Sequence, residues 1–228
     1  MRSASEKDLL IFDMDGVLVD VNASYRAAIQ ATVRHFVGWE PSHEDIQDWK
    51  NLGGWNDDWR LSTRLIQEKG GHTPYEEVVD YFQKLFLGDN NDGLILREEW
   101  LAKEGLFDRL EERHHLAVFT GRLRREAQIT LDRFLRGRFD PVIGADDVAH
   151  SKPDPEGLHK SCAAIAHGRC WYVGDTVDDA RASSAARIPF IGIASKSSPM
   201  RSELIRLLEA EGAVAVLDDI NSMEAVIA

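Results

Sequence analysis

Cysteine is scarce in this sequence, which holds only Cys162 and Cys170 in 228 residues. The pair lacks C-x-x-C spacing, and two thiols in a chain of this length suit a reducing compartment better than a disulfide framework. We therefore expect two packed thiols. The eight histidines are equally unspecific, because His114 and His115 are adjacent and the others are scattered. The sequence thus predicts packing or surface roles for the histidines and no histidine metal site.

Long apolar runs and positive charge are also lacking. The apolar run after the polar start, Leu9 to Phe12, is too short for a signal-peptide core or a membrane span. The formal charge is -12, from 39 acidic residues against 27 Lys and Arg, so DNA or an anionic membrane would meet net repulsion. We expect a cytoplasmic enzyme that acts on a small molecule, with neither nucleic acid nor a membrane as partner.

Short β-rich segments alternate with helical patterns over most of the chain. Several of the segments are nearly continuous apolar runs, as in parallel strands that are covered on both faces. The alternation predicts an α/β fold with a Rossmann-like, doubly wound parallel sheet. The expected strands are 9–13, 115–120, 140–145, 170–175, 188–194 and 213–219, and the helices between the later strands are 123–135, 154–166, 176–186 and 201–212.

About 100 residues without a convincing strand separate the first two strands. Within this gap, 24–38 and 76–88 carry apolar residues at helical spacing, and Gly38 is a stop signal for the first helix. We expect a helical cap domain at 21–92, inserted into a sheet domain formed by 1–20 and 93–228. The two short connections, near 18–22 and 90–97, could act as a hinge.

Polar side chains cluster where the predicted strands end. In an open parallel sheet, ligands bind beyond the carboxyl ends of the strands, where the strand order reverses. Singly, each such residue could be a turn former, a helix cap or a surface charge. Together, they predict a polar site to which four strand ends contribute residues: Asp13 and Asp15; Thr120, Gly121 and Arg122; Lys152; and Asp175, Asp178 and Asp179.

Four stretches, "DMDGV", "FTGR", "SKPDP" and "VGDTVDD", resemble the signature motifs of the haloacid dehalogenase-like superfamily. The resemblance is to the phosphoglycolate phosphatase-like branch, which carries a helical cap after the first motif. It implies that Asp13 is a nucleophile forming an aspartyl-phosphate, and that Asp15 is the general acid and then the base. The residues agree, since single-residue spacing in an extended segment puts both side chains on one side.

A positive centre is required because one anion attacks another. Two unit charges about 4 Å apart interact by roughly 4 kcal/mol at an effective dielectric of 20, and all-oxygen ligands favour Mg²⁺. By resemblance, the ligands are the Asp13 carboxylate, the Asp15 backbone carbonyl and Asp175. Asp179 would assist directly, through water or through the lysine, and Asp178 is an extra acid that could share the task.

The resemblance also implies phosphate-binding residues. Lys152 would neutralise charge on Asp13 and on the phosphoryl group, and Thr120 and the Gly121 N–H would hold phosphate oxygens. Arg122 either adds a bidentate contact or has a surface or helix-start role. In the cap, the segment 50–60 could contact substrate; the alternative is an interhelical turn with a packed Trp pair. Its candidate substrate-binding residues are Gly54, Trp55 and Asn56.

Asp15 distinguishes the branches of the superfamily. Dehalogenases and phosphonate-cleaving relatives lack it, so its presence favours phosphoryl transfer. Mutases resembling phosphoglucomutase keep it but carry a histidine where this chain has Tyr25, which leaves a phosphomonoester phosphatase as the better prediction. A catalytically silent binding or regulatory protein would be expected to lose Asp13, Asp15 or Lys152, and all three are present.

The substrate is less narrowly predicted than the reaction. The stretches "GGWNDDW" and "FTGR" together are similar to a branch linked to histidine biosynthesis. Histidinol phosphate is therefore one candidate substrate, beside phosphoglycolate and sugar phosphates.

Overall fold

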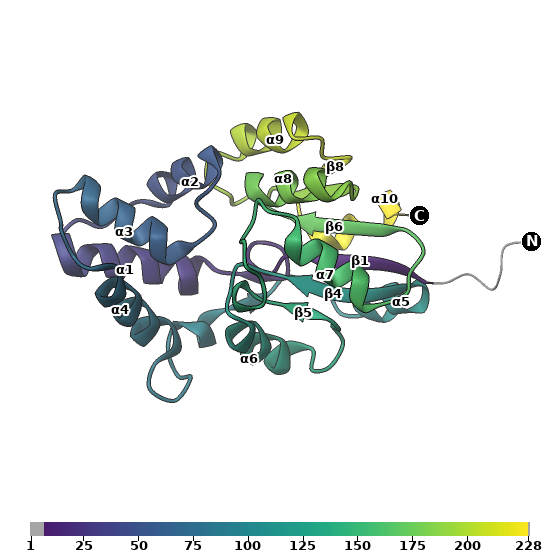
Figure 1. Ribbon diagram of the computed structural model, residues 1–228, viewed down its shortest axis with the longest axis horizontal. Helices are drawn as coiled ribbons and strands as arrows, with labels where there is room; N and C mark the ends of the chain where they lie inside the picture. The colour runs from purple at the N-terminus through teal and green to yellow at the C-terminus, as the bar shows by residue number, and fades with distance from the viewer. Residues whose placement is uncertain (1–6, 228) are drawn as a thin grey trace, which may run out of the picture. The chain divides into compact units, whose positions relative to one another are not determined.

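The structure is a computed structural model that describes residues 7–227 (Figure 1). The start of the expected sheet domain, residues 1–6, lies outside the described residues. The chain divides into two compact units, one formed by residues up to Val19 and from Trp100 onward, the other by Asp20–Glu99.

The first unit is built on a six-stranded sheet whose strands all pair in parallel. The central strand β1 pairs with β4 on one side and with β6 on the other, so the strand order reverses beside β1. This confirms the predicted Rossmann-like fold and places the switch point next to Asp13. In spatial order the strands are β5 (Val142–Ile143), β4 (His114–Phe119), β1 (Asp8–Phe12), β6 (Cys170–Gly174), β7 (Phe190–Ile193) and β8 (Ala215–Leu217).

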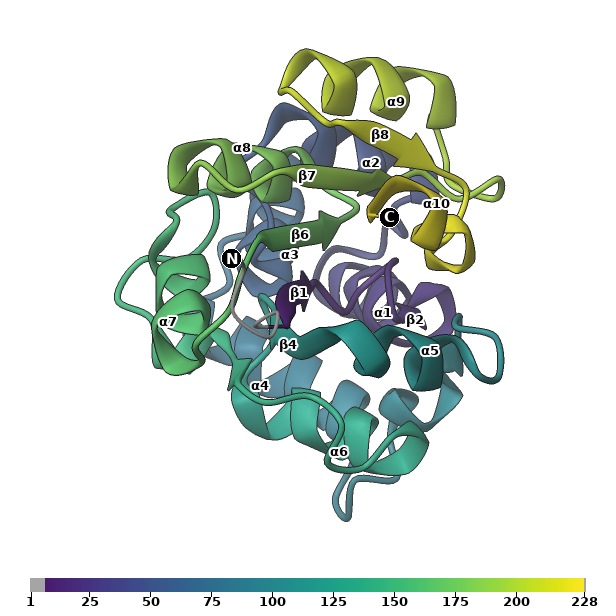
Figure 2. The same cartoon turned by 90° about the vertical axis from the view of Figure 1, so that its right-hand side faces the viewer.

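Helices cover both faces of this sheet because successive side chains of β1 point to opposite faces. Leu10 and Phe12 pack with α5 (Leu106–Arg113), α6 (Arg124–Phe134) and the last helix, α10 (Glu224–Ile227). Leu9 and Ile11 pack with α7 (Glu156–Ala164), α8 (Val177–Ala186) and α9 (Arg201–Ala210). Figure 2 shows α7 and α8 on one side of the strands and α5 and α10 on the other. The continuous apolar pattern of β1 follows from this double cover.

The second unit is helical. Helix α1 (Ala27–Val37) buries Ala28, Ile29 and Val33 and ends at Gly38, whose φ of 69° is the left-handed conformation that glycine tolerates. Helix α4 (Tyr75–Leu87) buries Val78, Phe82 and Phe86. The other elements of this unit are the π turn Asn22–Arg26, α2 (His43–Leu52), α3 (Asp58–Glu68) and the 3-10 turn Leu94–Arg97.

The second boundary of the helical unit lies later than the expected residue 92. Ile95 is fully buried, and the Ser24 hydroxyl donates to the Glu98 carboxylate at 3.4 Å. These contacts hold the segment 93–99 to the helical unit. Where the chain passes between the units, the short strands β2 (Val19–Asp20) and β3 (Glu99–Trp100) form a separate two-stranded sheet.

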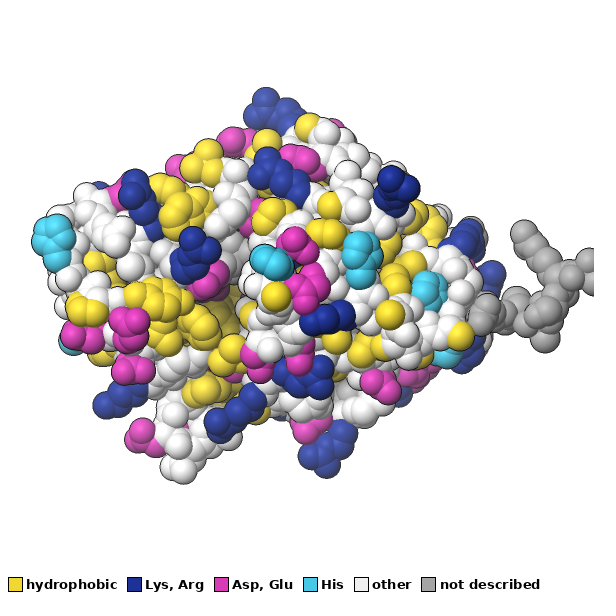
Figure 3. All heavy atoms as spheres, viewed as in Figure 1, with side chains coloured by type: hydrophobic (Ala, Val, Ile, Leu, Met, Phe, Trp, Pro, Cys, Tyr) yellow, Lys and Arg dark blue, Asp and Glu magenta, His cyan; other side chains and the backbone are white. Residues whose placement is uncertain are grey.

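The surface carries both signs of charge. On the face drawn in Figure 3, Lys and Arg side chains are interspersed with Asp and Glu side chains and do not gather in one area. No helix within residues 7–227 combines the length and the apolar character needed to cross a bilayer.

Candidate active site

Asp13 and Lys152 meet at the carboxyl end of β1. The Asp13 N–H donates to the Val173 carbonyl at 2.8 Å, which continues the pairing of β1 with β6 by one residue. Asp13 is 4% exposed, and Lys152 Nζ donates to its Oδ1 at 2.7 Å. Lys152 also donates to Asp179 Oδ1 at 2.7 Å. One buried ammonium therefore bridges two buried carboxylates that come from distant parts of the chain.

The three charges alter one another. Burial raises the pKa of Asp13 to about 7, and the nearby Asp179 and Asp15 add to this effect while Lys152 opposes it. For Lys152, burial alone would lower the pKa, but Asp13 and Asp179 outweigh it and raise the pKa. For Asp179, burial is likewise outweighed, and Lys152 with several hydrogen-bond donors lowers the pKa. Lys152 and Asp179 thus form a fixed ion pair beside the more protonatable Asp13.

Asp179 has hydrogen bonds on both carboxylate oxygens. Tyr172 donates its hydroxyl to Oδ1 at 2.6 Å. Oδ2 accepts from the Thr176 hydroxyl at 2.6 Å, from the Thr176 N–H at 3.0 Å and from the Asp175 N–H at 3.2 Å. The contacts with Thr176 complete a capping box that begins α8. Among the predicted roles of Asp179, this geometry favours the one exerted through Lys152.

Carboxylate oxygens of Asp13, Asp175 and Asp179 lie within 4.8 Å of one another, and this oxygen donor set suits Mg²⁺. Gly16 helps to make the space. Its φ is +71°, and a Cβ built on it would lie 2.1 Å from Asp175 Oδ2. A larger residue at position 16 would displace that carboxylate. With the glycine in place, the three carboxylates offer the oxygen ligands that fit the predicted cation. Asp178 is also buried but does not belong to this group of three.

Arg122 is buried, at 2% exposed, and its side chain contacts Asp15. Nε and Nη2 lie 2.7 and 2.6 Å from Asp15 Oδ1, and Nη1 donates to the Thr130 hydroxyl at 3.0 Å. The alternative of a surface role for Arg122 is therefore wrong. The hydroxyl of Thr120, directly after β4, accepts the Arg122 N–H at 3.2 Å. Arg122, the last residue of the "FTGR" motif, thus fixes the orientation of Asp15.

The predicted cap residues lie in the other unit, in the turn between α2 and α3. Gly54 has a φ of +79°, and Trp55 packs edge-to-face on Trp49 with ring centroids 4.8 Å apart. Lys50 and Asp58 form an ion pair of 2.8 Å across the turn. The segment is thus an interhelical turn, but Trp55 packs on Trp49 and not on a second Trp of the segment 50–60. Substrate contact by Gly54, Trp55 and Asn56 stays a prediction.

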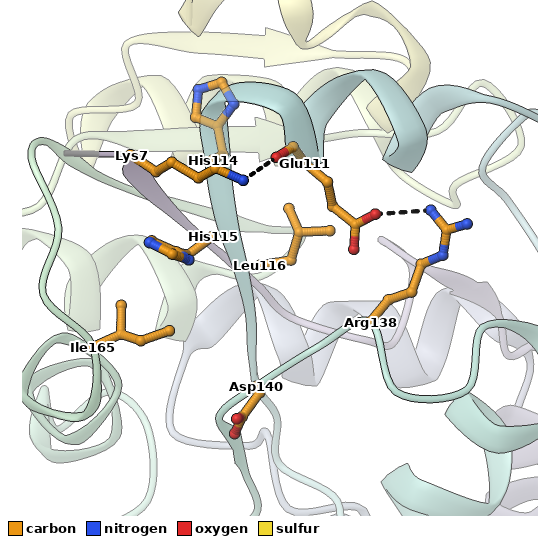
Figure 4. Close-up of a pocket in the computed structure, with 8 residues that line it drawn as sticks. All are labelled: Lys7, Glu111, His114, His115, Leu116, Arg138, Asp140 and Ile165. Carbon is orange, nitrogen blue, oxygen red and sulfur yellow. Dashed lines mark hydrogen bonds and ion pairs between the residues drawn. The ribbon is translucent and has the colours of Figure 1, made fainter. Parts of the chain in front are cut away.

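A pocket of about 230 Å³ lies at the start of β4 (Figure 4). His114 and His115 line it at the beginning of the strand, whereas Thr120 follows the strand's end. Lys7 donates to the Glu111 carbonyl, and Glu111 pairs with Arg138 at 3.0 Å. Lys7, Glu111 and Arg138 thus already contact one another, and the pocket is separate from the carboxylate cluster.

Tyr172 is a site residue that sequence reasoning missed. It is fully buried in β6, and its hydroxyl bonds to Asp179. The available sign was a phenol inside an otherwise apolar strand, since a buried hydroxyl requires a partner. The next residue but one, Gly174, has no room for a side chain, because a Cβ there would lie 2.5 Å from Asp179 Cβ.

Comparison with known sequences identifies the family of this chain. Residues 7–187 match the family described as haloacid dehalogenase-like hydrolase. The chain belongs to this family. The matched residues include the carboxylate cluster and all four motifs.

Individual relatives of this haloacid dehalogenase-like hydrolase differ in name and length. The chain is 34% identical to an imidazoleglycerol-phosphate dehydratase of Phytophthora nicotianae, over 94% of this chain and 51% of the relative. It is 26% identical to phosphoglycolate phosphatase 1 of Pseudomonas aeruginosa, over 79% of this chain and 66% of that protein. The chain thus spans about half and about two thirds of these curated relatives.

Solved structures show the same fold. A haloacid dehalogenase-like protein from Agrobacterium tumefaciens superposes with a TM-score of 0.74 at 20% sequence identity, covering 97% of both chains.

Proposed function

We propose that this chain is a Mg²⁺-dependent phosphatase that hydrolyses a small-molecule phosphomonoester, with Asp13 as the nucleophile. The observation that carries the proposal is the contact of 2.7 Å between Lys152 and Asp13 at the switch point of the sheet. A cation held there offsets the repulsion between a carboxylate and a phosphate. A phosphatase among the relatives supports this choice of reaction.

In the first step, an Asp13 carboxylate oxygen attacks phosphorus, and the bond between phosphorus and the ester oxygen breaks. Asp15 gives its proton to that oxygen, so the alcohol leaves neutral and an aspartyl-phosphate remains on Asp13. Nε and Nη2 of Arg122 both contact Asp15 Oδ1, and we assign proton transfer to Oδ2. We therefore propose a positioning role for Arg122, and its predicted contact with substrate stays a prediction.

In the second step, Asp15 takes a proton from water as the water oxygen attacks phosphorus. The bond between phosphorus and Asp13 breaks, and inorganic phosphate leaves. The Thr120 hydroxyl and the Gly121 N–H hold phosphate oxygens in both steps, while Lys152 holds Asp13 in place.

The cation would be held by Asp13, Asp175 and the Asp15 carbonyl. When bound, Mg²⁺ supplies positive charge that stabilises the transferring phosphoryl group. Asp179 keeps Lys152 oriented through the contact of 2.7 Å, which is the indirect role that its own hydrogen bonds allow.

A mutase is less well supported. Tyr25 occupies the position at which the resembling mutases carry a histidine. It is buried against Phe86, with ring centroids 4.0 Å apart. A phenol packed inside the helical unit does not offer the acid–base group of an imidazole. We therefore assign water as the final phosphoryl acceptor.

For the substrate, we favour phosphates of organic alcohols with a neutral or cationic head, because many carboxylates surround the site. The name of the dehydratase relative includes imidazoleglycerol phosphate, a phosphate monoester that carries an imidazole. This supports histidinol phosphate as the first compound to test, followed by phosphoglycolate and sugar phosphates.

The test is a phosphate-release screen with Mg²⁺ over histidinol phosphate, phosphoglycolate, glucose 1-phosphate and pyrophosphate. The Asp13→Asn variant should lose activity by about 10⁴-fold or more, as removal of a nucleophile does. Asp20→Asn is the matched control, since the Asp20 side chain accepts from the Asn22 N–H at 2.8 Å and has no chemistry assigned.

Equal release by Asp13→Asn would remove Asp13 from its role. An isomerised sugar phosphate in place of free phosphate would establish the mutase. No release from any ester by the unmodified chain would contradict the phosphatase assignment.

A further inference from the structure

Two thiols and one imidazole meet at the opposite edge of the sheet from the carboxylates. Cys162 lies near the end of α7, Cys170 begins β6, and His167 lies in the loop between them. The two Sγ atoms are 3.5 Å apart, and both cysteines are free and half-buried. One ligand atom from each of the three residues lies within 4.8 Å of the others. The fold thus brings together three possible metal ligands whose spacing in the sequence does not indicate a metal site.

The His167 ring is held in an orientation that suits ligation. Its Nδ1 lies 2.8 Å from the Ile165 carbonyl oxygen. A carbonyl only accepts, so Nδ1 carries the proton, and the lone pair of the neutral ring is on Nε2. Metal-binding histidines almost always donate their other ring N–H to a carbonyl or carboxylate in this way. The hydrogen bond therefore fixes the tautomer that a cation requires.

The sulfur positions also suit a shared ion. With bonds of about 2.3 Å to a tetrahedral Zn²⁺, two sulfur ligands lie about 3.8 Å apart. The observed 3.5 Å between the Sγ atoms is close to this separation.

We propose that Cys162, His167 and Cys170 form a binding site for one thiophilic divalent cation of the Zn²⁺ class. Three protein ligands leave the fourth tetrahedral position to water. Sulfur and imidazole donors select such a cation over Mg²⁺, which prefers oxygen. The site is distinct from the carboxylate cluster, because Cys170 begins β6 whereas Asp175 follows its end.

The state of the thiols favours ligation. The hydrogen bond with Cys170 lowers the pKa of Cys162 to about 7; burial opposes this shift, and His167 adds to it. The same contact and burial raise the pKa of Cys170. Ligation requires deprotonated thiols, so cation binding would release thiol protons.

A bound cation would join α7 to β6 through the loop that connects them. This loop is anchored to the start of β1, since the Gly168 N–H donates to the Lys7 carbonyl at 3.0 Å and the Arg169 N–H donates to Asp8 at 2.8 Å. Ile165, in the same loop, lines the pocket of Figure 4. The cation would thus stabilise the amino edge of the sheet without touching the catalytic residues.

The test uses the whole chain, reduced and stripped of metal, in excess Mg²⁺ so that the carboxylate cluster does not compete for the probe. Co²⁺ should give thiolate charge-transfer absorption and tetrahedral ligand-field bands, at one ion per chain. Zn²⁺ should displace Co²⁺ and raise the thermal midpoint of unfolding. Since loss even of outer partners costs 10–100-fold in affinity, Cys162→Ser, Cys170→Ser and His167→Ala should each weaken binding by about tenfold or more.

His159→Ala is the matched control, because His159 is exposed on α7, and it should bind as the unmodified chain does. Absence of thiolate bands from the unmodified chain would overturn the proposal, and this result does not depend on the folding of any variant. So would equal Zn²⁺ affinity of the unmodified chain and Cys162→Ser. Neither result bears on phosphate release, so the proposed function is judged separately.

Discussion

The two ends of β6 differ in the chemistry they gather. At the carboxyl end, beside Gly174, the charges are buried and Lys152 contacts two carboxylates at 2.7 Å. At the amino end, Cys170 and His167 are half-buried, and the neighbouring ion pair of Arg169 with Asp8, at 3.0 Å, is partly exposed. Burial makes each charge at the carboxyl end depend on its partners. Substitutions there should affect activity and stability, whereas those at the amino end should affect stability or cation binding alone.

The largest difference in activity between substitutions at the two ends is expected from Asp15→Asn. Loss of a proton-transfer group lowers the rate by roughly 10²–10⁴-fold, and the amide cannot exchange a proton in either step. Phosphate release at saturating substrate, measured beside Cys170→Ser, checks this. Cys170→Ser should keep nearly full activity. A comparable loss in the two variants would contradict the separation of the two ends.

Lys152→Met should be next in size, and it should alter folding as well as catalysis. It leaves Asp13 and Asp179 buried without their cation, and breaking a buried ion pair in this way costs about 3–5 kcal/mol. Urea unfolding followed by circular dichroism measures the change. Lys160→Met is the matched control, because the partly exposed pair of Lys160 with Glu156, at 2.7 Å, should contribute little to stability. Similar losses from both would show that burial is not decisive.

Tyr172→Phe removes one hydroxyl from the carboxyl end and keeps the ring. The lost hydrogen bond is to a charged group, so the free energy of unfolding should fall by about 1.5–3 kcal/mol. Activity should also fall, because Asp179 orients Lys152. Tyr75→Phe, at an exposed tyrosine, should change stability by less than about 0.5 kcal/mol. An unchanged unfolding midpoint in Tyr172→Phe would mean that Asp179 does not need this donor.

The smallest effect is expected from His114, which begins the neighbouring strand β4 at the same amino edge of the sheet. Burial lowers its pKa, with Arg113 and Arg169 adding to the shift and Asp8 and the Leu110 carbonyl opposing it. Between the lowered folded value and the unfolded value of about 6.5, the unfolded chain binds more protons, so stability falls as the pH drops through this range. Urea unfolding from pH 7.5 to 5.5 should show a steeper decline for the unmodified chain than for His114→Asn. Equal slopes would remove His114 from this account.

Much of the fold follows from local pattern, and this is why the sequence predicted it. Each of the six expected strands overlaps an observed one, because continuous apolar runs such as Leu9 to Phe12 are incompatible with one-sided exposure. Helix α5 was missed, since its eight residues give too few turns for a clear period. The helical unit ends later than expected because Ile95 is held by long-range packing, which no local pattern records.

The site was predictable where a motif stands at a strand end, and not where partners come from elsewhere. Asp13 and Lys152 could be placed together because both follow parallel strands. The contact of Arg122 with Asp15 joins residues 107 positions apart, and its direction depends on side-chain rotamers. The meeting of Cys162, His167 and Cys170 depends on how the loop after α7 returns to β6, which spacing alone does not determine.

Asp179 serves two structures with one carboxylate. Through Thr176 it begins α8, and through Lys152 it fixes the charge beside Asp13. The contact between Lys152 and Asp179 therefore depends on the first turn of α8 being formed. If the turn frays, the ammonium loses one of its two anchors, and catalytic competence and local order disappear in a single opening event. In native-state hydrogen exchange, the amide of Asp179 should accordingly exchange at a rate that reports how often the first turn of α8 opens.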